Sequence, residues 1–379
     1  MKVLHIHTTG NIFSGLETLL VTLARERHLC PEMEPQFALV RERNLLLDFE
    51  GRLTPELVST GAKIHQLETP RLRYPWQVFR ARSKLAQIID LEGIDVVICH
   101  ACWPQVMFGS VAKRLGKPLL FWYHSIYTGR SWLEKLARLI PPDLVIAVSQ
   151  YTQGQIHRLY SNVPSRVVYA PVTAVKVEDS HLVRQRIRQK LGTPADTTVI
   201  IQVSRLDRLK GHSATIAALG EMRDDPLWEC WMVGGVQWDW EQIYLEELQA
   251  QARQLGLEER IRFLGQRSDV ADLLVAADIF CQSNVVEDSF GLVFIEALYA
   301  GLPVVTVAIG GGGEIVTSDC GYAVPPGQVG EITQALQELI QNPTKRQEFR
   351  TSAQLRAIEL CDPQQQLAKL YRVIQEINV

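Results

Sequence analysis

Residues 197–211 read TTVIIQVSRLDRLKG, an apolar, β-branched run that leads into a polar loop with several cations. A run of this kind, too short for a helix and bounded by polar residues, is typical of a buried strand in a parallel sheet. Similar runs recur on both sides of it, each followed by a longer segment with helical periodicity. The alternation predicts an α/β fold with doubly wound sheets, whose strands deliver their loops to one edge.

Two such sheets fit the length of 379 residues, which allows about two domains of ordinary size. The alternation pauses in the polar stretch 173–180 and resumes at the quoted strand. We therefore expect one Rossmann-like domain over residues 1–172 and a second over 173–361, with ligands in a cleft between them. The last segment, 362–379, begins with Asp and Pro and carries one apolar stripe, so it is predicted to be a helix that needs a partner surface.

Charge is distributed unevenly along the chain, although its net value is only −3. Residues 1–170 hold 20 Lys and Arg against 14 Asp and Glu, and the remainder holds 19 against 28. A basic first half suits an anionic acceptor or an acidic membrane surface, while ordinary solvated faces produce the same imbalance. The Arg residues are dispersed and no RNA-binding or zinc-finger pattern occurs, which argues against nucleic acid as a partner.

The N-terminal sequence and the cysteine content indicate in which cellular compartment the protein is expected. The apolar stretch near Met1 lacks the long hydrophobic run and cleavage site of a signal peptide, and no window reaches 18 apolar residues. The cysteines number seven, and an odd count argues for reduced thiols. We expect a cytoplasmic chain, with Cys99 and Cys102 at a buried strand end rather than in a metal or redox site.

The loop after the quoted strand brings two cations, Arg205 and Lys210, to the start of a helix near His212. A guanidinium, an ammonium and a helix N-terminus together can neutralise a diphosphate. The loop is neither a Walker loop nor a dinucleotide fingerprint, because GxxxxGK[ST] and GxGxxG are both missing. Taken alone, the two cations are better explained as part of an ordinary charged surface than as an anion site.

A second informative stretch reads EDSFGLVFIE, residues 287–296, and encloses carboxylates in apolar sequence. A helix that starts at about Phe290 would put Asp288 at its mouth and Glu296 two turns in, while Gly291 would let backbone N–H groups approach a ligand. Such carboxylates can accept hydrogen bonds from the vicinal hydroxyls of a sugar and a ribose. The alternative is a helix cap followed by a solvated Glu.

Taken in order, these stretches resemble glycosyltransferase family 4, the large retaining GT-B group. The resemblance runs from Thr8 to about Leu336. It rests on six patterns, which are the cation loop, Arg262–Gly265 before Asp269, the paired acids, Ala297–Pro303, Gly310–Val316 and Gly321–Pro326. It implies a GT-B fold with two Rossmann-like domains, the first on the acceptor side and the second binding the nucleotide sugar. It also implies that the C-terminal helix crosses back to the first domain.

The resemblance assigns roles to residues of the second half. Arg205 and Lys210 would hold the donor diphosphate, Glu296 the ribose hydroxyls and Asp288 the transferred sugar. Other donor-binding positions would be Phe290, Gly291, Leu292 and, through main chain near the base, Arg267. The family's first acid is usually Glu, so the shorter Asp288 leaves open whether Glu287 takes part.

The resemblance also reaches the first half. The family's glycine loop is represented by Ser14, Gly15, Leu16 and Glu17, whose backbone would contact phosphate or acceptor. His124 follows a predicted strand where the family has a histidine facing the transferred sugar, although a plain hydrogen-bonded loop histidine remains the alternative.

Aromatic and imidazole side chains near the same edge are candidates for contact with the acceptor. These candidates are His100, Trp103, Tyr123 and Tyr127, for each of which core packing is an equal explanation. The segment Trp132–Ile140 is predicted to be a short helix whose apolar stripe faces the core, with contact to a membrane interface as the alternative.

The resemblance implies a retaining glycosyltransferase that moves a sugar from a UDP- or GDP-type donor to a hydroxyl of a glycan, lipid or polysaccharide precursor. No acidic pattern for a divalent ion stands out, so the reaction is expected to need neither metal nor cofactor. Peripheral association with the inner face of a membrane is compatible with the basic first half. The competing hypothesis is an inactive GT-B protein that binds glycans or nucleotide sugars.

Overall fold

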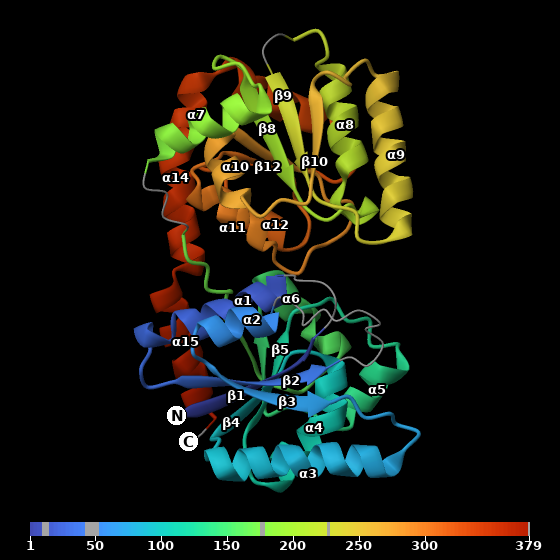
Figure 1. The fold of residues 1–379 in the computed structure, drawn as a ribbon, viewed down its shortest axis with the longest axis vertical. Coiled ribbons are helices and arrows are strands. Elements are labelled where there is room, and N and C mark those ends of the chain that lie inside the picture. Colours follow the sequence, from blue (N-terminus) through green and yellow to red (C-terminus); the bar gives the residue numbers. More distant parts are fainter. Residues whose placement is uncertain (10–14, 42–52, 175–178, 226–227, 378–379) are drawn as a thin grey trace. The chain divides into compact units, whose positions relative to one another are not determined.

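A computed structural model describes residues 1–9, 15–41, 53–174, 179–225 and 228–377. The chain divides into two compact units (Figure 1). Unit 1 comprises Met1–Thr173 and Cys361–Val379, and unit 2 comprises Ala174–Leu360. Each unit contains one sheet in which every strand pair is parallel. The predicted α/β fold with two doubly wound sheets is therefore confirmed.

The sheet of unit 1 has the order β3-β2-β1-β4-β5-β6-β7. Its strands are β1 (Lys2–Thr9), β2 (Glu34–Arg41), β3 (Lys63–Glu68), β4 (Val96–Cys99), β5 (Leu119–Tyr123), β6 (Leu144–Ala147) and β7 (Ser165–Val167). The order reverses between β1 and β4, where the loops after neighbouring strands turn in opposite directions and leave a crevice. The carboxyl ends of these two strands therefore mark the expected ligand position in unit 1.

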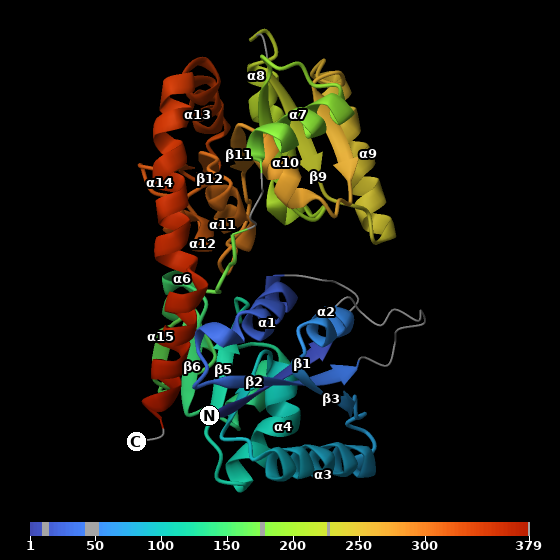
Figure 2. The ribbon, with the colours of Figure 1, turned by 60° about the vertical axis from the view of Figure 1, so that its left-hand side comes forward.

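Helices cover both faces of this sheet, with α1 and α2 on one face and α3 and α4 on the other (Figure 2). The helices of unit 1 are α1 (Gly15–Arg25), η1 (Arg27–Leu29), α2 (Leu53–Ser59), α3 (Pro75–Glu92), α4 (Cys102–Arg114), α5 (Trp132–Arg138), α6 (Gln150–Gln155), η2 (Ile156–Arg158) and α15 (Pro363–Gln375). Because side chains alternate along a strand, Leu4 and Ile6 of β1 join the core beneath α3 and α4. His5 and His7 consequently point to the opposite face, which α1 covers.

The C-terminal helix α15 is part of unit 1. Asp362 caps it by accepting a 2.9 Å hydrogen bond from the backbone N–H of Gln365, and Leu367, Leu370 and Ile374 are buried. The side-chain oxygen of Gln366 accepts a hydrogen bond from the backbone N–H of Tyr169 at 3.1 Å. These contacts give the predicted apolar stripe its partner surface within unit 1.

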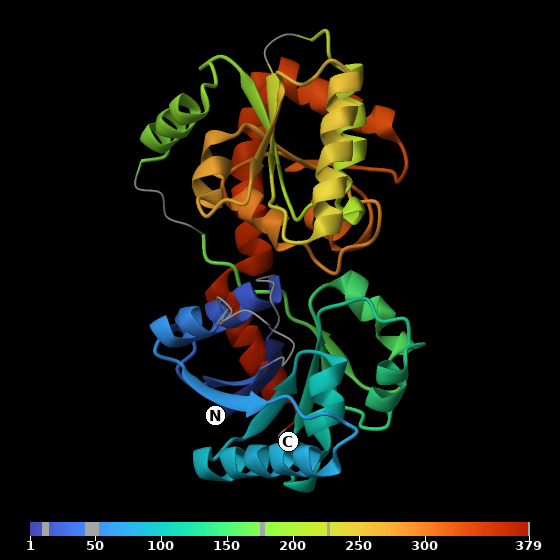
Figure 3. The ribbon, with the colours of Figure 1, turned by 45° about the vertical axis from the view of Figure 1, so that its right-hand side comes forward.

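The sheet of unit 2 has the order β10-β9-β8-β11-β12-β13 and reverses between β8 and β11. Its strands are β8 (Thr198–Val203), β9 (Trp228–Val233), β10 (Ile261–Gly265), β11 (Ile279–Gln282), β12 (Val304–Val307) and β13 (Gly321–Val324). Its helices are α7 (Ser180–Leu191), η3 (Arg208–Lys210), α8 (His212–Glu221), α9 (Asp239–Gln254), α10 (Val270–Ala276), α11 (Leu292–Tyr299), α12 (Gly310–Ile315), α13 (Val329–Gln341) and α14 (Pro343–Cys361). Figures 1 and 3 show α8 and α9 side by side along this sheet.

The quoted strand is β8, and five of its six residues are buried, as the apolar run predicted. The core of unit 2 collects apolar side chains from β8, β9, β11 and the helices α8, α9 and α13. Burial of each such side chain removes apolar area from water and stabilises the unit by roughly 2 kcal/mol before entropy costs. The reversal of strand order therefore places the loops after β8 and β11 next to each other on a rigid support.

The predicted start of one helix needs correction, and the predicted packing of another is confirmed in part. Helix α11 begins at Leu292 and not at about Phe290, because Gly291 has φ 101° and cannot continue a right-handed helix. The apolar stripe predicted to face the core does so through Leu133 and Ala137 of α5 and Ile140 just after it, although Trp132 is 60% and Leu139 76% exposed. The helix also buries Glu134, whose carboxylate caps the helix start together with Ser131.

Candidate functional site

The cation loop and the acidic loop of unit 2 are held against each other by backbone contacts. The hydroxyl of Ser283 donates to the carbonyl of Gly211 at 2.8 Å, and the N–H of Val285 donates to the carbonyl of Leu209 at 3.0 Å. Gly211 has φ 71°, and a Cβ there would lie 1.6 Å from the Ser283 carbonyl oxygen. Only glycine permits this approach, a requirement that the sequence analysis did not identify.

Lys210 and Asp288 meet at this junction. The ammonium of Lys210 donates to a carboxylate oxygen of Asp288 at 2.6 Å, and each side chain keeps about a fifth of its surface exposed. The backbone of Lys210 is held in place by β8, because its carbonyl accepts a hydrogen bond from the buried side-chain amide of Gln202 at 2.9 Å. The structure thus brings together two residues that the sequence assigned to one ligand.

Arg205 lies earlier in the same loop and is more exposed than Lys210. Its guanidinium is 3.8 Å from the carboxylate of Asp207, a loose contact for an ion pair. Asp207 also accepts a 3.0 Å hydrogen bond from the backbone N–H of Leu209 and so caps η3. The Arg205 side chain is therefore available to an anion while the loop around it is ordered.

The acidic loop is also supported from its other side by the glycines that begin α12. A Cβ at Gly310 would lie 2.4 Å from the carbonyl oxygen of Asp288, and one at Gly311 would lie 2.4 Å from the backbone of Phe290. The N–H of Gly311 donates to the Asp288 carbonyl at 2.8 Å. Phe290 itself is buried, whereas Glu287 is exposed. This packing fixes the direction of Asp288 and leaves Glu287 at the rim.

Glu296 lies in α11 and is the most electrostatically perturbed carboxyl group of unit 2. Burial raises its pKa from 4.5 to about 7, with no charged neighbour contributing to the shift. A carboxyl group in such surroundings gains from hydrogen-bond donors that would stabilise its charge. The hydroxyls of a ligand are suitable donors, as the sequence analysis expected for a ribose.

Leu292 is the first residue of α11; it follows Gly291 at the helix N-terminus and is partly buried. Arg267 sits in the loop after β10, where its guanidinium forms a two-pronged pair with Asp269 at 2.7 and 2.5 Å. That pair raises the pKa of Arg267 and keeps its side chain occupied. Any ligand contact of Arg267 would therefore come from its backbone, in agreement with the sequence expectation.

Unit 1 contains a chain of three histidines at the reversal of its strand order. Nδ1 of His5 lies 2.9 Å from Nε2 of His100, and Nδ1 of His100 lies 2.8 Å from Nε2 of His124. The ring of His100 also stacks against Trp122 at 5.6 Å. The chain runs from inside the sheet on β1 to the partly exposed His124 after β5.

The chain has a preferred direction of proton donation. Desolvation lowers the pKa of His5 and of His124 to about 3 and that of His100 well below 6.5, so all three rings are neutral. Nε2 of His5 is buried and has no partner among the described residues. At this buried position, a ring nitrogen without a proton costs less free energy than an N–H group that has no acceptor. The proton of His5 is therefore placed on Nδ1 and not on Nε2. His5 then donates to His100 and His100 to His124, whose own Nδ1–H is left as the donor at the exposed end.

His100 was one of the acceptor candidates, but it is only 1% exposed and lies between the other two imidazoles. It therefore supports His124 rather than presenting a surface to a ligand. Trp103 and Tyr127 pack against the apolar core of unit 1, and burial raises the pKa of Tyr127 well above 10. Tyr123 is buried as well. For these aromatic residues the structure favours the packing explanation.

A second histidine contact lies beside this chain. Nε2 of His7 on β1 is 3.0 Å from a carboxylate oxygen of Glu17 on α1, and both side chains are buried. The contact ties the start of α1 to the sheet. Gly15 is the exposed first residue of that helix, while Ser14 of the expected glycine loop lies outside the described residues.

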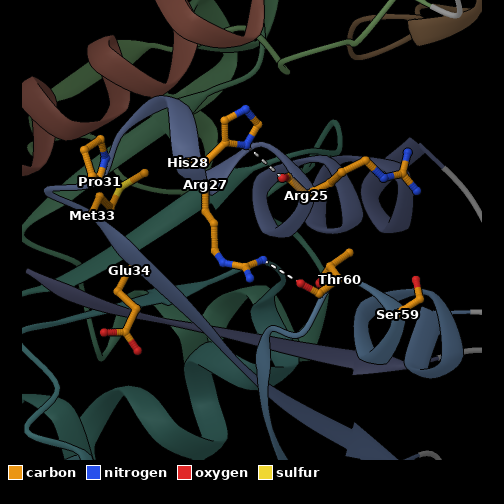
Figure 4. Close-up of a pocket in the computed structure, with 8 residues that line it drawn as sticks. All are labelled: Arg25, Arg27, His28, Pro31, Met33, Glu34, Ser59 and Thr60. Carbon is orange, nitrogen blue, oxygen red and sulfur yellow. Dashed lines mark hydrogen bonds between the residues drawn. The ribbon is translucent and has the colours of Figure 1, made fainter.

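One hollow of unit 1 that is lined by several cations does not lie at this edge. A pocket of about 540 Å³ is lined by residues that include Arg25, Arg27, Glu34 and Thr60 (Figure 4). It lies near the amino end of β2, away from the carboxyl ends that carry the histidines. Arg27 donates to the carbonyls of Ala24 and Thr60 at 2.6 and 2.8 Å, so its charge is already used to join α1 and α2.

Metal and membrane-spanning features are absent from the described part of the chain. No group of three or more His, Cys, Asp or Glu residues there could hold a metal ion. Cys99 and Cys102 are buried free thiols, as predicted, and burial raises the pKa of each. No helix within the described ranges is both long and apolar enough to cross a bilayer.

Two family models match the chain. "Glycosyltransferase Family 4" matches residues 33–174, and "Glycosyl transferases group 1" matches residues 183–356. Together they cover most of both units.

Curated relatives match over both units as well. A GDP-mannose-dependent monoacylated α-(1-6)-phosphatidylinositol monomannoside mannosyltransferase of Corynebacterium glutamicum is 27% identical over 80% of this chain and 86% of its own. An N-acetyl-α-D-glucosaminyl L-malate synthase of Bacillus anthracis is 24% identical over 71% of this chain and 70% of its own. These relatives use different acceptors.

Solved structures show the same fold over nearly the whole chain. Anabaena HepE in complex with UDP has a TM-score of 0.82 at 24% identity and covers 99% of this chain and 100% of its own. A glycosyltransferase of Rickettsia africae has a TM-score of 0.84 at 18% identity, covering 99% of this chain and 98% of its own.

Proposed function

Because this chain belongs to glycosyltransferase family 4 and is a glycosyltransferase with the GT-B fold, we propose that it transfers a sugar from a UDP- or GDP-type donor, with retention, to a hydroxyl acceptor. The observation that carries the proposal is the convergence of Lys210, Asp288 and the start of α11 in unit 2. Cation, carboxylate and helix end are the groups that a diphosphate sugar needs at one place.

The chemical problem in such a transfer is the negative charge that builds up on the leaving diphosphate. Arg205 and Lys210 are proposed to neutralise that charge, since preorganised groups need no reorganisation when the charge develops. The bond between the anomeric carbon and the diphosphate oxygen breaks while a bond to the acceptor oxygen forms on the same face. The proton of the acceptor hydroxyl passes to the leaving diphosphate.

The carboxylates of unit 2 are proposed to bind the donor rather than to attack it. Asp288 would accept a hydrogen bond from the transferred sugar and Glu296 from the ribose. His124 of unit 1 is proposed to donate from Nδ1 to the sugar. We propose no covalent sugar–protein intermediate, so trapping a sugar on Asp288 or Glu287 would contradict this mechanism.

The acceptor is proposed to be a lipid-linked or glycan hydroxyl. This choice is supported by the relative from Corynebacterium glutamicum, which by its name acts on a phosphatidylinositol mannoside. The reaction is also proposed to be metal-independent, because Arg205 and Lys210 already provide two positive charges at the loop. Loss of turnover on chelation, with recovery on addition of manganese, would overturn that part.

A thermal-shift panel tests the donor proposal directly. UDP-, GDP- and ADP-sugars are added to the full chain, and stabilisation is read from the rise in Tm. We expect a rise with one nucleotide class that Arg205→Ala and Glu296→Ala abolish. A flat response to every donor would favour the competing hypothesis of an inactive GT-B protein that binds glycans, and slow hydrolysis of a donor sugar would exclude it.

A further inference from the structure

The beginning of α3 in unit 1 exposes large apolar side chains. Trp76 is 65% exposed and Phe79 74%, and Leu72 in the preceding turn is 43% exposed. Buried residues of the same helix, Ala81 and Leu85, belong to the core beneath it. The helix therefore has a satisfied inner face and a separate outer apolar face.

Cations surround these apolar side chains. Arg71, Arg73, Arg80 and Lys84 are exposed, and none of them forms an ion pair within the part of the chain that the structure describes. Residues 69–89 contain no Asp or Glu. The guanidinium of Arg73 lies 4.8 Å from the ring centre of Tyr74. The segment thus presents uncompensated positive charge next to exposed aromatic rings.

A small hollow opens within this segment. Its volume is about 200 Å³, and Trp76, Arg80 and Lys84 line it on the α3 side, with Thr69 and Pro70 from the preceding loop. Glu68 at the end of β3 is its one acidic lining residue. The side-chain oxygen of Gln77 accepts a 3.1 Å hydrogen bond from the backbone N–H of Arg71, which fixes the loop against the helix. A phosphate-sized anion would find two cations there.

We propose that this α3 surface, made of Leu72, Trp76, Phe79, Arg71, Arg73, Arg80 and Lys84, docks on the headgroup region of an anionic lipid bilayer. Aromatic side chains are favoured at that depth, and cations attract acidic headgroups. Charge complementarity identifies the partner, because the four cations have one acidic neighbour, Glu68, and none of them forms an ion pair among the described residues. An acidic glycan would use the cations but would leave Phe79 and Leu72 exposed to water.

The position of the surface agrees with a lipid-linked acceptor, and in this respect the inference rests on the proposed function. The loop that leads into α3 follows the carboxyl end of β3, and His124 follows β5 at the same edge of the sheet. Four strand spacings separate β3 from β5 in the order β3-β2-β1-β4-β5, which is roughly 20 Å. A headgroup held at the α3 surface would lie within reach of the acceptor side of unit 1.

Co-sedimentation with vesicles tests the docking without any donor or turnover. The full chain is mixed with vesicles of phosphatidylcholine alone and with vesicles that also contain phosphatidylglycerol. We expect strong binding only to the acidic vesicles, weakened by added salt. Arg80→Gln/Lys84→Gln should reduce partitioning by about 25-fold, at roughly fivefold per cation. Trp76→Ser/Phe79→Ser should reduce it at least about tenfold.

Matched controls are available on the same protein. Leu91→Ser removes an 85% exposed apolar residue at the other end of α3, and Arg223→Gln/Arg253→Gln removes two exposed cations of unit 2. Neither should change binding. Equal binding to neutral and acidic vesicles, or unchanged binding of both α3 variants, would overturn the inference. The inference would also be overturned if inorganic phosphate released the protein from the vesicles while chloride at the same ionic strength did not. Binding to a soluble acidic polysaccharide without binding to vesicles would overturn it as well.

The thermal-shift response to the nucleotide sugar is read on the same variants. Because none of the α3 residues belongs to the donor site, that response should persist in each of them. If a variant loses vesicle binding but keeps the thermal shift with the nucleotide sugar, the loss is due to the docking surface alone. If the wild type shows no thermal shift with any nucleotide sugar, the proposed function is contradicted and the docking inference is not.

Discussion

The ammonium of Lys210 lies 2.6 Å from the carboxylate of Asp288, although 78 residues separate them in the chain. Each of the two charges has the other as its partner. A donor diphosphate would compete with Asp288 for Lys210, and the transferred sugar would offer hydroxyls to Asp288 in return. The pair therefore holds both groups in place before the donor arrives.

The first prediction concerns this pair. Asp288→Asn should lower kcat by about 100-fold, because the transferred sugar loses a charged hydrogen-bond acceptor and Lys210 loses the ion pair that positions its ammonium. The free energy of unfolding should change by less than about 1 kcal/mol, since partly exposed ion pairs contribute little. Steady-state kinetics and urea unfolding measure the two effects.

Glu287→Gln is the control for that experiment. Glu287 is the exposed neighbour of Asp288, and its substitution should leave kcat within about threefold of the wild type. A loss as large as that of Asp288→Asn would show instead that Glu287 takes over part of the role that the family usually gives to a glutamate.

The second prediction follows from the pKa of Glu296, which burial raises from 4.5 to about 7. The folded state binds this proton more tightly than the unfolded state, so the contribution to stability is greatest at low pH. It is lost as the pH rises from about 4.5 to about 7, by at most about 3 kcal/mol. The Tm difference between Glu296→Gln and the wild type should therefore grow in favour of the variant up to pH 7.

Donor binding should show the opposite trend in the wild type. The ionised carboxylate is the better acceptor for ribose hydroxyls, so affinity should rise with pH through about 7 and stay flat in Glu296→Gln. A Tm difference that is constant from pH 5 to pH 8 would contradict the raised pKa.

The third prediction uses two glycines with the same backbone conformation. Gly211→Ala should destabilise the protein by more than about 3 kcal/mol, because the added Cβ would lie 1.6 Å from the Ser283 carbonyl oxygen at φ 71°. Gly327 has φ 76°, and a Cβ added there would meet nothing within 4 Å, so Gly327→Ala should cost only about 1 kcal/mol. Equal losses in chemical denaturation would mean that the contact between the two loops can relax.

The sequence was sufficient for the fold and for the residue types of the donor loop. Strands such as β8 are buried, so their apolar runs are unambiguous, and Arg205 and Lys210 stand out because they follow such a run. Glu296 stands out because it is a carboxylate within the apolar sequence of α11. The pairing of Lys210 with Asp288 could not be predicted, because it depends on which loops the strand order brings together. The exposure of Trp132 and Leu139 beside the core-facing stripe of α5 could not be predicted, because an apolar residue next to such a stripe can face either the core or the solvent.

The histidine chain was missed for a related reason. His5 lies within an apolar strand, and its contact with His100 depends on β1 and β4 being neighbours, which neither segment shows alone. The one available signal was the alternation of β1, which puts His5 and His7 on the same face.

The fourth prediction is that His100 positions His124 by holding its proton on Nδ1. In the wild type, nitrogen-detected NMR of the imidazoles should show the Nδ1–H form for His5, His100 and His124, without protonation of these rings between pH 5 and 8.

His100→Gln should reduce kcat by about 10- to 100-fold with a smaller effect on KM, because the orientation of His124 is lost while the donor loops of unit 2 are intact. His65→Gln is the control, since His65 is a half-buried histidine of the same sheet whose Nε2 lies 3.0 Å from the side-chain oxygen of Gln36, outside the row of His5, His100 and His124. An Nε2–H signal from His124 in the wild type would mean that proton donation among the three histidines runs in the opposite direction. An unchanged NMR signature of His124 in His100→Gln would show that His100 has a packing role only.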